Sequence, residues 1–244
     1  MTQHQGRAHT PLATTQPATQ NKLRKHRPTR FTGVDIQSQL STPVGFISAR
    51  KVREIVTISG RGVRGYFPSR KGKLLKFESL GEEDVLRTLE VANLVEKLVT
   101  QPCVLEFEGE GKRRRYTPDV LASIKGISYF IETKSEGFQK NSRVVNHLRD
   151  VIRYLRREKA PFILITANDV RVAGLQDELK DLLSKRPCPG RFDPDIDPTL
   201  WDPRNLDHAD ADLLERWHRA QEECNALIRR LMNRDPDSLL TTTP

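Results

Sequence analysis

The sequence of 244 residues predicts an α/β fold in which helices flank a mixed β-sheet. Three observations predict it. Apolar residues recur at helical spacing over residues 79–99, three strand-like segments follow over residues 101–134, and a short, wholly apolar run at 161–166 lies between two further amphipathic stretches. With a 36% hydrophobic content, the chain is long enough to bury one substantial core, with or without a small appendage.

The elements are expected in the order helix, three strands, helix, strand, helix. Ser79 and Glu82 have the spacing of a capping box, which places the first helix start at Ser79. The three strands are expected in "QPCVLEFEG", "YTPDVLASI" and "ISYFIETK", with "GEGKRRR" as a charged hairpin turn. "SRVVNHLRDVIRYLRREK" predicts the second helix, "PFILIT" a strand buried on both faces, and residues 172–183 a third helix.

The remaining segments divide the chain. Residues 1–30 are rich in Gln, Thr and Pro and are expected to form a disordered basic arm, either a solvated tail or a contact that orders on binding the DNA backbone or a partner. An apolar seam at alternating spacings of four and three predicts a helical C-terminal appendage that packs on its own domain or on a partner; its residues are Leu213, Trp217, Ala220, Cys224, Leu227 and Leu231. The expected boundaries are 1–30 arm, 31–76 basic lead-in of loops and short strands, 77–186 core, 187–206 linker, 207–234 amphipathic helix and 235–244 tail.

The charge distribution points to a polyanionic partner. The formal net charge is +9, yet residues 193–244 hold 12 Asp and Glu against 6 Arg, so the preceding 192 residues carry 35 basic and 20 acidic side chains. No apolar run approaches the roughly 20 residues that cross a bilayer, and no signal-peptide pattern opens the sequence. We therefore expect a cytoplasmic protein without a membrane partner. The three cysteines lack metal-ligand spacing and predict neither a disulfide framework nor a zinc site.

Asp119, Glu132 and Lys134 form the most informative pattern. In a strand, Glu132 and Lys134 point to the same face, and a hairpin around "SIKG" would bring Asp119 beside Glu132. Two neighbouring carboxylates repel each other unless a cation neutralises them, and Mg²⁺ binds one or two carboxylates together with phosphate oxygens. Lys134 could then act on the attacking water or the developing phosphate charge. A cross-strand salt bridge is the structural alternative.

The wider pattern resembles a known nuclease superfamily. "TPD" followed by "ETK", with Glu132 lying 13 residues after Asp119, matches the PD-(D/E)xK nucleases, whose restriction-endonuclease-like core is a mixed sheet between helices. "FESLGEEDVLRTLE", "TQP" and "RRRYTPDVL", with the upstream "SGRGVRGYFPSRKGKLLKFES", resemble the TnsA-type endonucleases of heteromeric bacterial transposons over roughly residues 45–170. Gly81 departs from that pattern, since an apolar residue is usual there.

The resemblance implies a function and a site. It implies Mg²⁺-dependent cleavage of one DNA strand at transposon ends, with Mn²⁺ as a substitute, beside a strand-transfer transposase subunit and an AAA+ regulator. Carried over by position, Glu82, Asp119, Glu132 and Lys134 form the catalytic set, and the three carboxylates are the metal ligands. Glu82 has an alternative role as a helix cap. A stand-alone restriction- or repair-type endonuclease and a non-catalytic DNA-binding assembly subunit are the rival functions.

Overall fold

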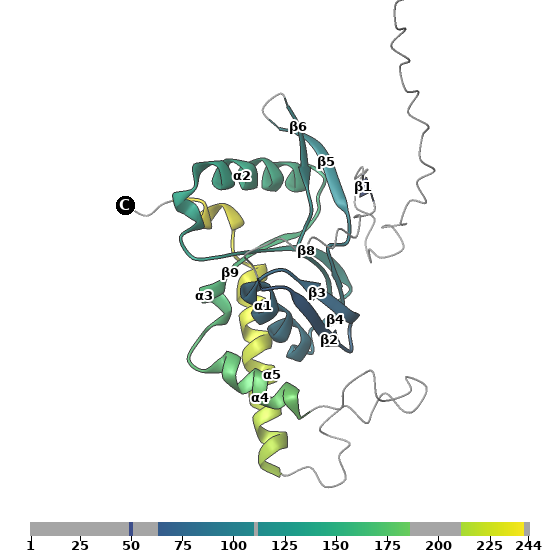
Figure 1. Cartoon of the computed structure of the whole chain (residues 1–244), viewed down its shortest axis with the longest axis vertical. Coiled ribbons are helices and arrows are strands. Elements are labelled where there is room, and N and C mark those ends of the chain that lie inside the picture. The colour runs from purple at the N-terminus through teal and green to yellow at the C-terminus, as the bar shows by residue number, and fades with distance from the viewer. Residues whose placement is uncertain (1–48, 51–62, 110–111, 186–210, 242–244) are drawn as a thin grey trace, which may run out of the picture. The chain divides into compact units, whose positions relative to one another are not determined.

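A computed structural model of the chain describes residues 49–50, 63–109, 112–185 and 211–241. The expected arm at 1–30, most of the lead-in and the expected linker at 187–206 lie outside these residues. The α/β class expected from the sequence is confirmed, because helices flank a mixed four-stranded sheet (Figure 1). This central sheet has the strand order β4-β7-β8-β9, antiparallel except for the parallel pair β8 and β9; its strands are β4 (Val95–Thr100), β7 (Val120–Ile124), β8 (Ile127–Lys134) and β9 (Phe162–Thr166).

A two-residue turn sets the register of β7 against β8. Ile124 pairs with Ile127, and the two residues between them, Lys125 and Gly126, have φ angles of 50° and 75°. Positive φ at both central positions is the geometry of a tight hairpin whose twist matches the strands. The hairpin expected around "SIKG" is thus confirmed, and its register runs to the pair Val120 and Ile131.

Two smaller sheets accompany the central one. An antiparallel hairpin is formed by β2 (Gly65–Ser69) and β3 (Lys73–Phe77). A three-stranded antiparallel sheet has the order β1-β5-β6, with β1 (Ala49–Arg50), β5 (Val104–Gly109) and β6 (Lys112–Tyr116). The end of the expected basic lead-in is therefore part of the core, because Phe67 and Leu75 of the β2–β3 hairpin are buried there beside Phe77.

Helices pack against the central sheet in two groups. α1, α4 and α5 share one apolar core with Val120 and Ile131, whereas α2 packs with Leu121 and Phe130, the alternate residues of the same strands. Because successive residues of a strand point to opposite faces, α2 and the α1 group lie on opposite sides of the sheet. The helices are α1 (Leu80–Val91), α2 (Ser142–Arg157), α3 (Ala167–Val170), α4 (Leu175–Ser184) and α5 (Ala211–Met232), with one-turn 3₁₀ helices η1 (Phe138–Lys140) and η5 (Pro236–Leu239).

The helix expected over residues 79–99 is shorter than its sequence pattern. α1 begins after Ser79 as expected but ends at Val91, and residues 95–100 form strand β4. A β-bulge between Val95 and Lys97 interrupts the two-residue alternation of this strand. Val95 and Leu98 are therefore both buried at a spacing of three, which imitates helical periodicity. Together with β6, the strand β4 brings the number of strands between α1 and α2 to five rather than the expected three.

Two other boundaries differ from those expected. The basic residues "KRRR" belong to strand β6, not to a turn, and Tyr116 is the last residue of that strand. Thr117 to Asp119 then separate β6 from β7, because Pro118 has no backbone N–H to donate to a ladder. The strand expected to begin at Tyr116 therefore begins at Val120.

The C-terminal helix is part of the fold rather than an appendage. Ala220, Cys224, Leu227 and Leu231 of the expected apolar seam are buried in the core shared with α1 and α4. The tail after α5 also packs, since Leu240 is buried beside α2. Of the two arrangements left open by the sequence, packing on the helix's own domain is the one observed. Within the described residues, no helix combines the length and the apolar character needed to cross a membrane.

Candidate active site

Glu132 and Lys134 project from the end of β8 toward α2. The Lys134 ammonium donates a hydrogen bond to Glu132 Oε1, and Glu132 is 5% exposed. Both side chains line an open pocket of about 410 Å³, whose other walls come from β6, from Thr117 and from α2. Glu132 and Lys134 therefore share a face of the strand, as expected from their spacing. The pocket gives them a route to solvent.

Asp119 lies beside this pair. It directly precedes Val120, whose partner across the hairpin is Ile131, so the register brings Asp119 next to Glu132. Asp119 Oδ2 accepts a hydrogen bond from the backbone N–H of Thr133 at 2.7 Å. Among the described residues, none donates a hydrogen bond to Asp119 Oδ1. The structure thus brings Asp119, Glu132 and Lys134 together at one end of the β7–β8 pair.

Burial and the neighbouring charges shift the pKa values of Asp119 and Lys134. Burial and then the Glu132 carboxylate raise the pKa of Asp119 to about 8, against the opposing effect of Lys134. For Lys134, burial lowers the pKa, but the carboxylates of Glu132 and Asp119 outweigh burial, and the net pKa lies above its ordinary value. Lys134 is therefore a persistent cation. One ammonium does not fully offset two carboxylates in this partly buried position.

Tyr116 supports the pair from strand β6. Its hydroxyl donates a hydrogen bond of 2.7 Å to Glu132 Oε2, and burial, followed by the charge of Glu132, raises the pKa of Tyr116 well above its ordinary value. The phenol thus stays protonated and holds the carboxylate in place. Sequence reasoning did not select Tyr116; the tyrosine that opens "YTPD" was the available signal.

His147 is a second residue of this pocket outside the predicted catalytic set. It lies on α2, contacts the Tyr116 ring edge-on at 6.2 Å between centroids, and lines the pocket with Glu132 and Lys134. Burial and the charge of Arg114 lower the pKa of His147, so the imidazole is neutral at neutral pH.

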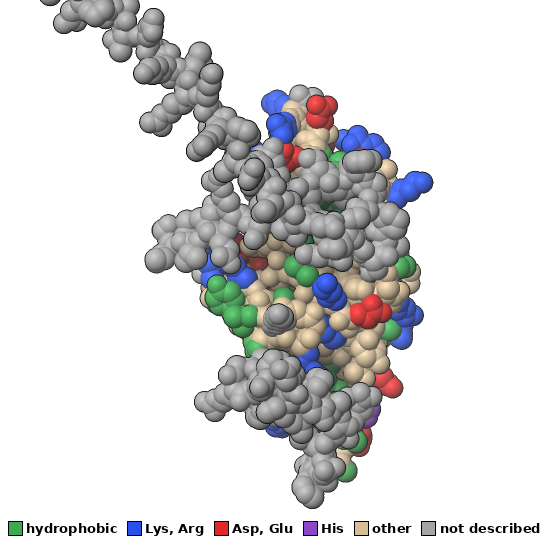
Figure 2. All heavy atoms as spheres, turned by 90° about the vertical axis from the view of Figure 1, so that its right-hand side faces the viewer, with side chains coloured by type: hydrophobic (Ala, Val, Ile, Leu, Met, Phe, Trp, Pro, Cys, Tyr) green, Lys and Arg blue, Asp and Glu red, His purple; other side chains and the backbone are tan. Residues whose placement is uncertain are grey.

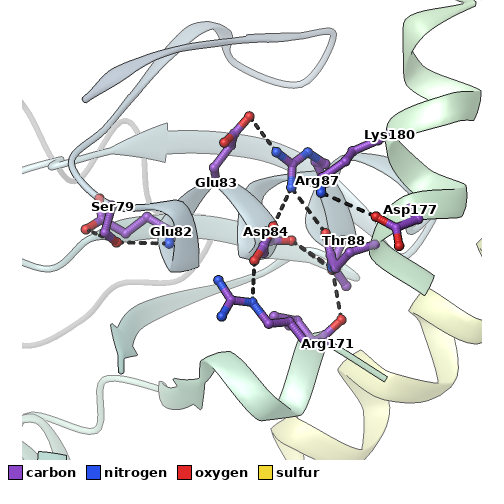
Figure 3. Close-up of polar contacts among 11 residues, drawn as sticks. Ser79, Glu82, Glu83, Asp84, Arg87, Thr88, Arg171, Asp177 and Lys180 are labelled. Carbon is purple, nitrogen blue, oxygen red and sulfur yellow. Dashed lines mark hydrogen bonds and ion pairs between the residues drawn. The ribbon is translucent and has the colours of Figure 1, made fainter. Parts of the chain in front are cut away.

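Glu82 takes part in capping α1. Its backbone N–H donates to Ser79 Oγ at 3.2 Å, and its carboxylate accepts from the Ser79 hydroxyl and from the backbone N–H of Glu78 (Figure 3). The start of α1 nevertheless lies near β8, since a Cβ atom on Gly81 would be 3.7 Å from Thr133 Cγ2. Burial raises the pKa of Glu82, and the charges of Glu78 and Glu132 add to the effect. A ligand role for Glu82 stays a prediction.

The carboxylates of the described structure match the predicted three-carboxylate metal site only in part. Across the described residues, no three His, Cys, Asp or Glu side chains gather closely enough to hold a metal ion. Asp119 and Glu132 do present neighbouring carboxylate oxygens, and the charge of Glu132 contributes to the raised pKa of Asp119. A bound cation would relieve this repulsion between the two carboxylates. Two carboxylates suffice for Mg²⁺ when phosphate oxygens and water complete its coordination. These two residues fit Mg²⁺ or Mn²⁺.

Arg115 of β6 lines the pocket, and Arg113 lies two residues before it on the same strand. Arg115 and Arg113 both pair with the buried Glu106 on β5, and Arg115 Nε lies 3.2 Å from Glu106 Oε1. Their side chains are nonetheless 69% and 67% exposed. In Figure 2, Lys and Arg side chains gather at the end of the molecule that carries the β5–β6 hairpin. The hairpin is thus a candidate phosphate contact beside the pocket.

A second polar cluster on α1 is separate from this site. Arg87 pairs with Glu83 and Asp84, and Asp84 Oδ2 accepts from Arg171 Nε at 2.7 Å (Figure 3). Gln176 donates to Asp84 O and to Thr88 Oγ1. The cluster ties α1 to α4 and to the segment between α3 and α4, and its charges are mutually paired.

No protein-family model matches the chain, and no curated protein sequence matches it significantly.

Proposed function

We propose that this chain is a metal-dependent DNA endonuclease with a restriction-endonuclease-like core. The observation that carries the proposal is the cluster of Asp119, Glu132 and Lys134, in which two carboxylates lie together and a lysine lines the same pocket as Glu132. The resemblance of the surrounding motifs supports the narrower proposal of a TnsA-type subunit. Such a subunit would cut one strand at transposon ends together with a strand-transfer transposase and an AAA+ regulator.

Each side chain has a task in this proposal. Asp119 and Glu132 would hold Mg²⁺, with Glu82 as a third ligand once its carboxylate leaves the helix cap, and the cation would supply Lewis-acid stabilisation of phosphate charge. Tyr116 fixes the orientation of Glu132 through its hydrogen bond. Lys134, kept protonated by its neighbours, stabilises negative charge as it develops on the phosphate. Because its pKa is raised, Lys134 is a poor general base, so we assign it the electrostatic task.

One observation favours a second function. Glu82 caps its helix, and three carboxylates are not gathered in one place in the described structure. A non-catalytic DNA-binding assembly subunit, with Lys134 and Glu132 as a strand ion pair, would have the same features.

Cleavage assays separate these functions. End-labelled DNA carrying candidate transposon ends is incubated with Mg²⁺ or EDTA, with and without the partner subunits. The proposal predicts one-strand cleavage that needs Mg²⁺ and is lost in Asp119→Asn. Efficient cutting of arbitrary plasmid without partners would indicate a stand-alone endonuclease. Assembly-dependent recombination that is unaffected by Asp119→Asn would indicate the non-catalytic subunit.

A further inference from the structure

The exposed face of α2 carries arginine as its only charged residue type. The exposed positions of this helix are Ser142, Arg143, Asn146, Arg149, Arg153, Arg156 and Arg157. Its one acidic residue, Asp150, is only 3% exposed. From Arg143 to Arg157 the face extends for about 20 Å at 1.5 Å per residue. A helix whose solvated face is only structural would be expected to mix both signs of charge.

The arginines differ in how far acids compensate their charge. Arg143 forms no ion pair or side-chain hydrogen bond with the described residues, and Arg149 bonds only to Asn146 Oδ1 and to Leu240 O, which are neutral. Arg153 pairs with Asp150, an acid that it shares with Arg114. The first half of the helix therefore carries uncompensated positive charge.

The last two arginines of the face pair with acidic residues of the same chain. Arg156 pairs with Asp235 and Asp237 of the C-terminal turn, both at 2.7 Å, and Arg157 Nε pairs with Glu158 at 3.1 Å. The uncompensated charge is thus confined to the end of α2 that leads to the candidate active site.

That end of α2 is continuous with the pocket. Arg143 and His147 line the same pocket as Glu132, Lys134 and Arg115. The β5–β6 hairpin is joined to α2 by the ion pair of Arg114 and Asp150 at 3.4 Å. The approach is close, because a Cβ atom on Gly109 would lie 2.8 Å from Asp150 Oδ2. Arg115 of the hairpin and Arg143 of α2 are thus exposed arginines that line the same pocket.

We propose that Arg143, Arg149 and Arg153 form a binding track for the sugar-phosphate backbone of double-stranded DNA next to the cut site. The inference deepens the proposed function and rests on it for the identity of the polyanion. A guanidinium binds phosphate through paired N–H donors, and an arginine bonded on one side keeps others for a ligand. From Arg143 to Arg153 the track extends for about 15 Å at 1.5 Å per residue, or about four base pairs at 3.4 Å per step. Beyond the track on the same face, Arg156 is paired with Asp235 and Asp237.

Binding of a labelled duplex in EDTA tests the track without cleavage. The variant Arg143→Gln/Arg149→Gln removes two charges and breaks no ion pair of the described structure. Arg219→Gln/Arg230→Gln on α5 removes the same charge from the opposite side of the sheet. The track predicts that the α2 variant binds about 10- to 30-fold more weakly at 0.15 M salt, with a log–log salt slope smaller by about 1.8. The α5 control and Arg143→Lys/Arg149→Lys should bind nearly as the wild type does.

The results also separate this inference from the proposed function. Equal affinity and salt slope in the α2 variant and the wild type would refute the DNA-binding track. The exposed arginines of α2 would then be assigned to an acidic protein partner. Equal losses in the α2 and α5 variants would overturn the track as well, because the effect would then be one of net charge. If the α2 variant alone loses DNA affinity but the wild type never cuts DNA in Mg²⁺, the nuclease proposal fails and the track stands.

Discussion

Replacing Asp119 by asparagine should stabilise the metal-free protein at alkaline pH. In the folded chain, burial and the Glu132 carboxylate raise the pKa of Asp119 to about 8 from an ordinary value of 3.8. Asparagine has nearly the same shape and can still accept the hydrogen bond from the Thr133 N–H. The substitution therefore removes the unfavourable charge while keeping the backbone contact.

The direction of the pH dependence follows from the raised pKa. A carboxyl group with a higher pKa in the folded state binds its proton more tightly there, so its favourable contribution is complete below pH 4. That contribution is lost as the pH rises to about 8. Between pH 5 and pH 8, the wild type should lose up to about 4 kcal/mol relative to Asp119→Asn, at 1.36 kcal/mol per pH unit.

Urea unfolding in EDTA across that pH range measures the difference. Asp169→Asn is the matched control, because burial raises the pKa of Asp169 but the hydrogen bond from Arg234 and those from Thr166 outweigh it. Its net pKa is lowered, so Asp169→Asn should destabilise the protein at neutral pH. If Asp119→Asn destabilises the protein as Asp169→Asn does, Asp119 is a structural ion-pair residue and the reasoning is refuted.

Three further predictions concern the same pocket. Lys134→Ala should lower the single-turnover cleavage rate by roughly 100-fold and leave DNA affinity and its salt slope nearly unchanged. Cleavage by this variant at the wild-type rate would show that Lys134 serves only as an ion-pair partner of Glu132 within the strand. Tyr116→Phe should cost about 1.5–3 kcal/mol of stability in urea unfolding, because it removes a buried hydrogen bond to a carboxylate; an unchanged midpoint would show that Glu132 needs no such support. Cleavage should vanish in EDTA and return with Mn²⁺, while Ca²⁺ binds without supporting it; persistent cleavage in EDTA would indicate a metal-free reaction.

The position of Asp119 beside Glu132 could be predicted because local rules determine it. A two-residue turn at Lys125 and Gly126 fixes the hairpin register, and the strand period of two then places Glu132 and Lys134 on one face. Both rules act within 16 residues of sequence. The start of α1 at Ser79 was predictable for the same reason, since a cap is a local contact.

The features that sequence reasoning missed depend on irregular or long-range contacts. The bulge between Val95 and Lys97 gives strand β4 the apolar spacing of a helix, so periodicity alone chose the wrong element. Tyr116 meets Glu132 only because β6 crosses to the α2 side of the sheet. Glu82 caps α1, and the start of α1 also lies near β8. The "SLGE" sequence predicts the cap but does not indicate that this helix end lies beside β8.

Mn²⁺ binding followed by electron paramagnetic resonance tests the central claim most directly, namely that Asp119 and Glu132 together form a divalent-cation site. The titration compares the wild type with Asp119→Asn, Glu132→Gln and Glu96→Gln at pH 8.5, where Asp119 is ionised. Glu96 is an exposed carboxylate on β4, bonded to Ser123 and to the Gly126 N–H, and serves as the control. The claim predicts one saturable Mn²⁺ per chain in the wild type and in Glu96→Gln, and loss of that ion in the other two variants. Saturable binding that survives in Asp119→Asn, or a wild type that binds no Mn²⁺, would contradict it.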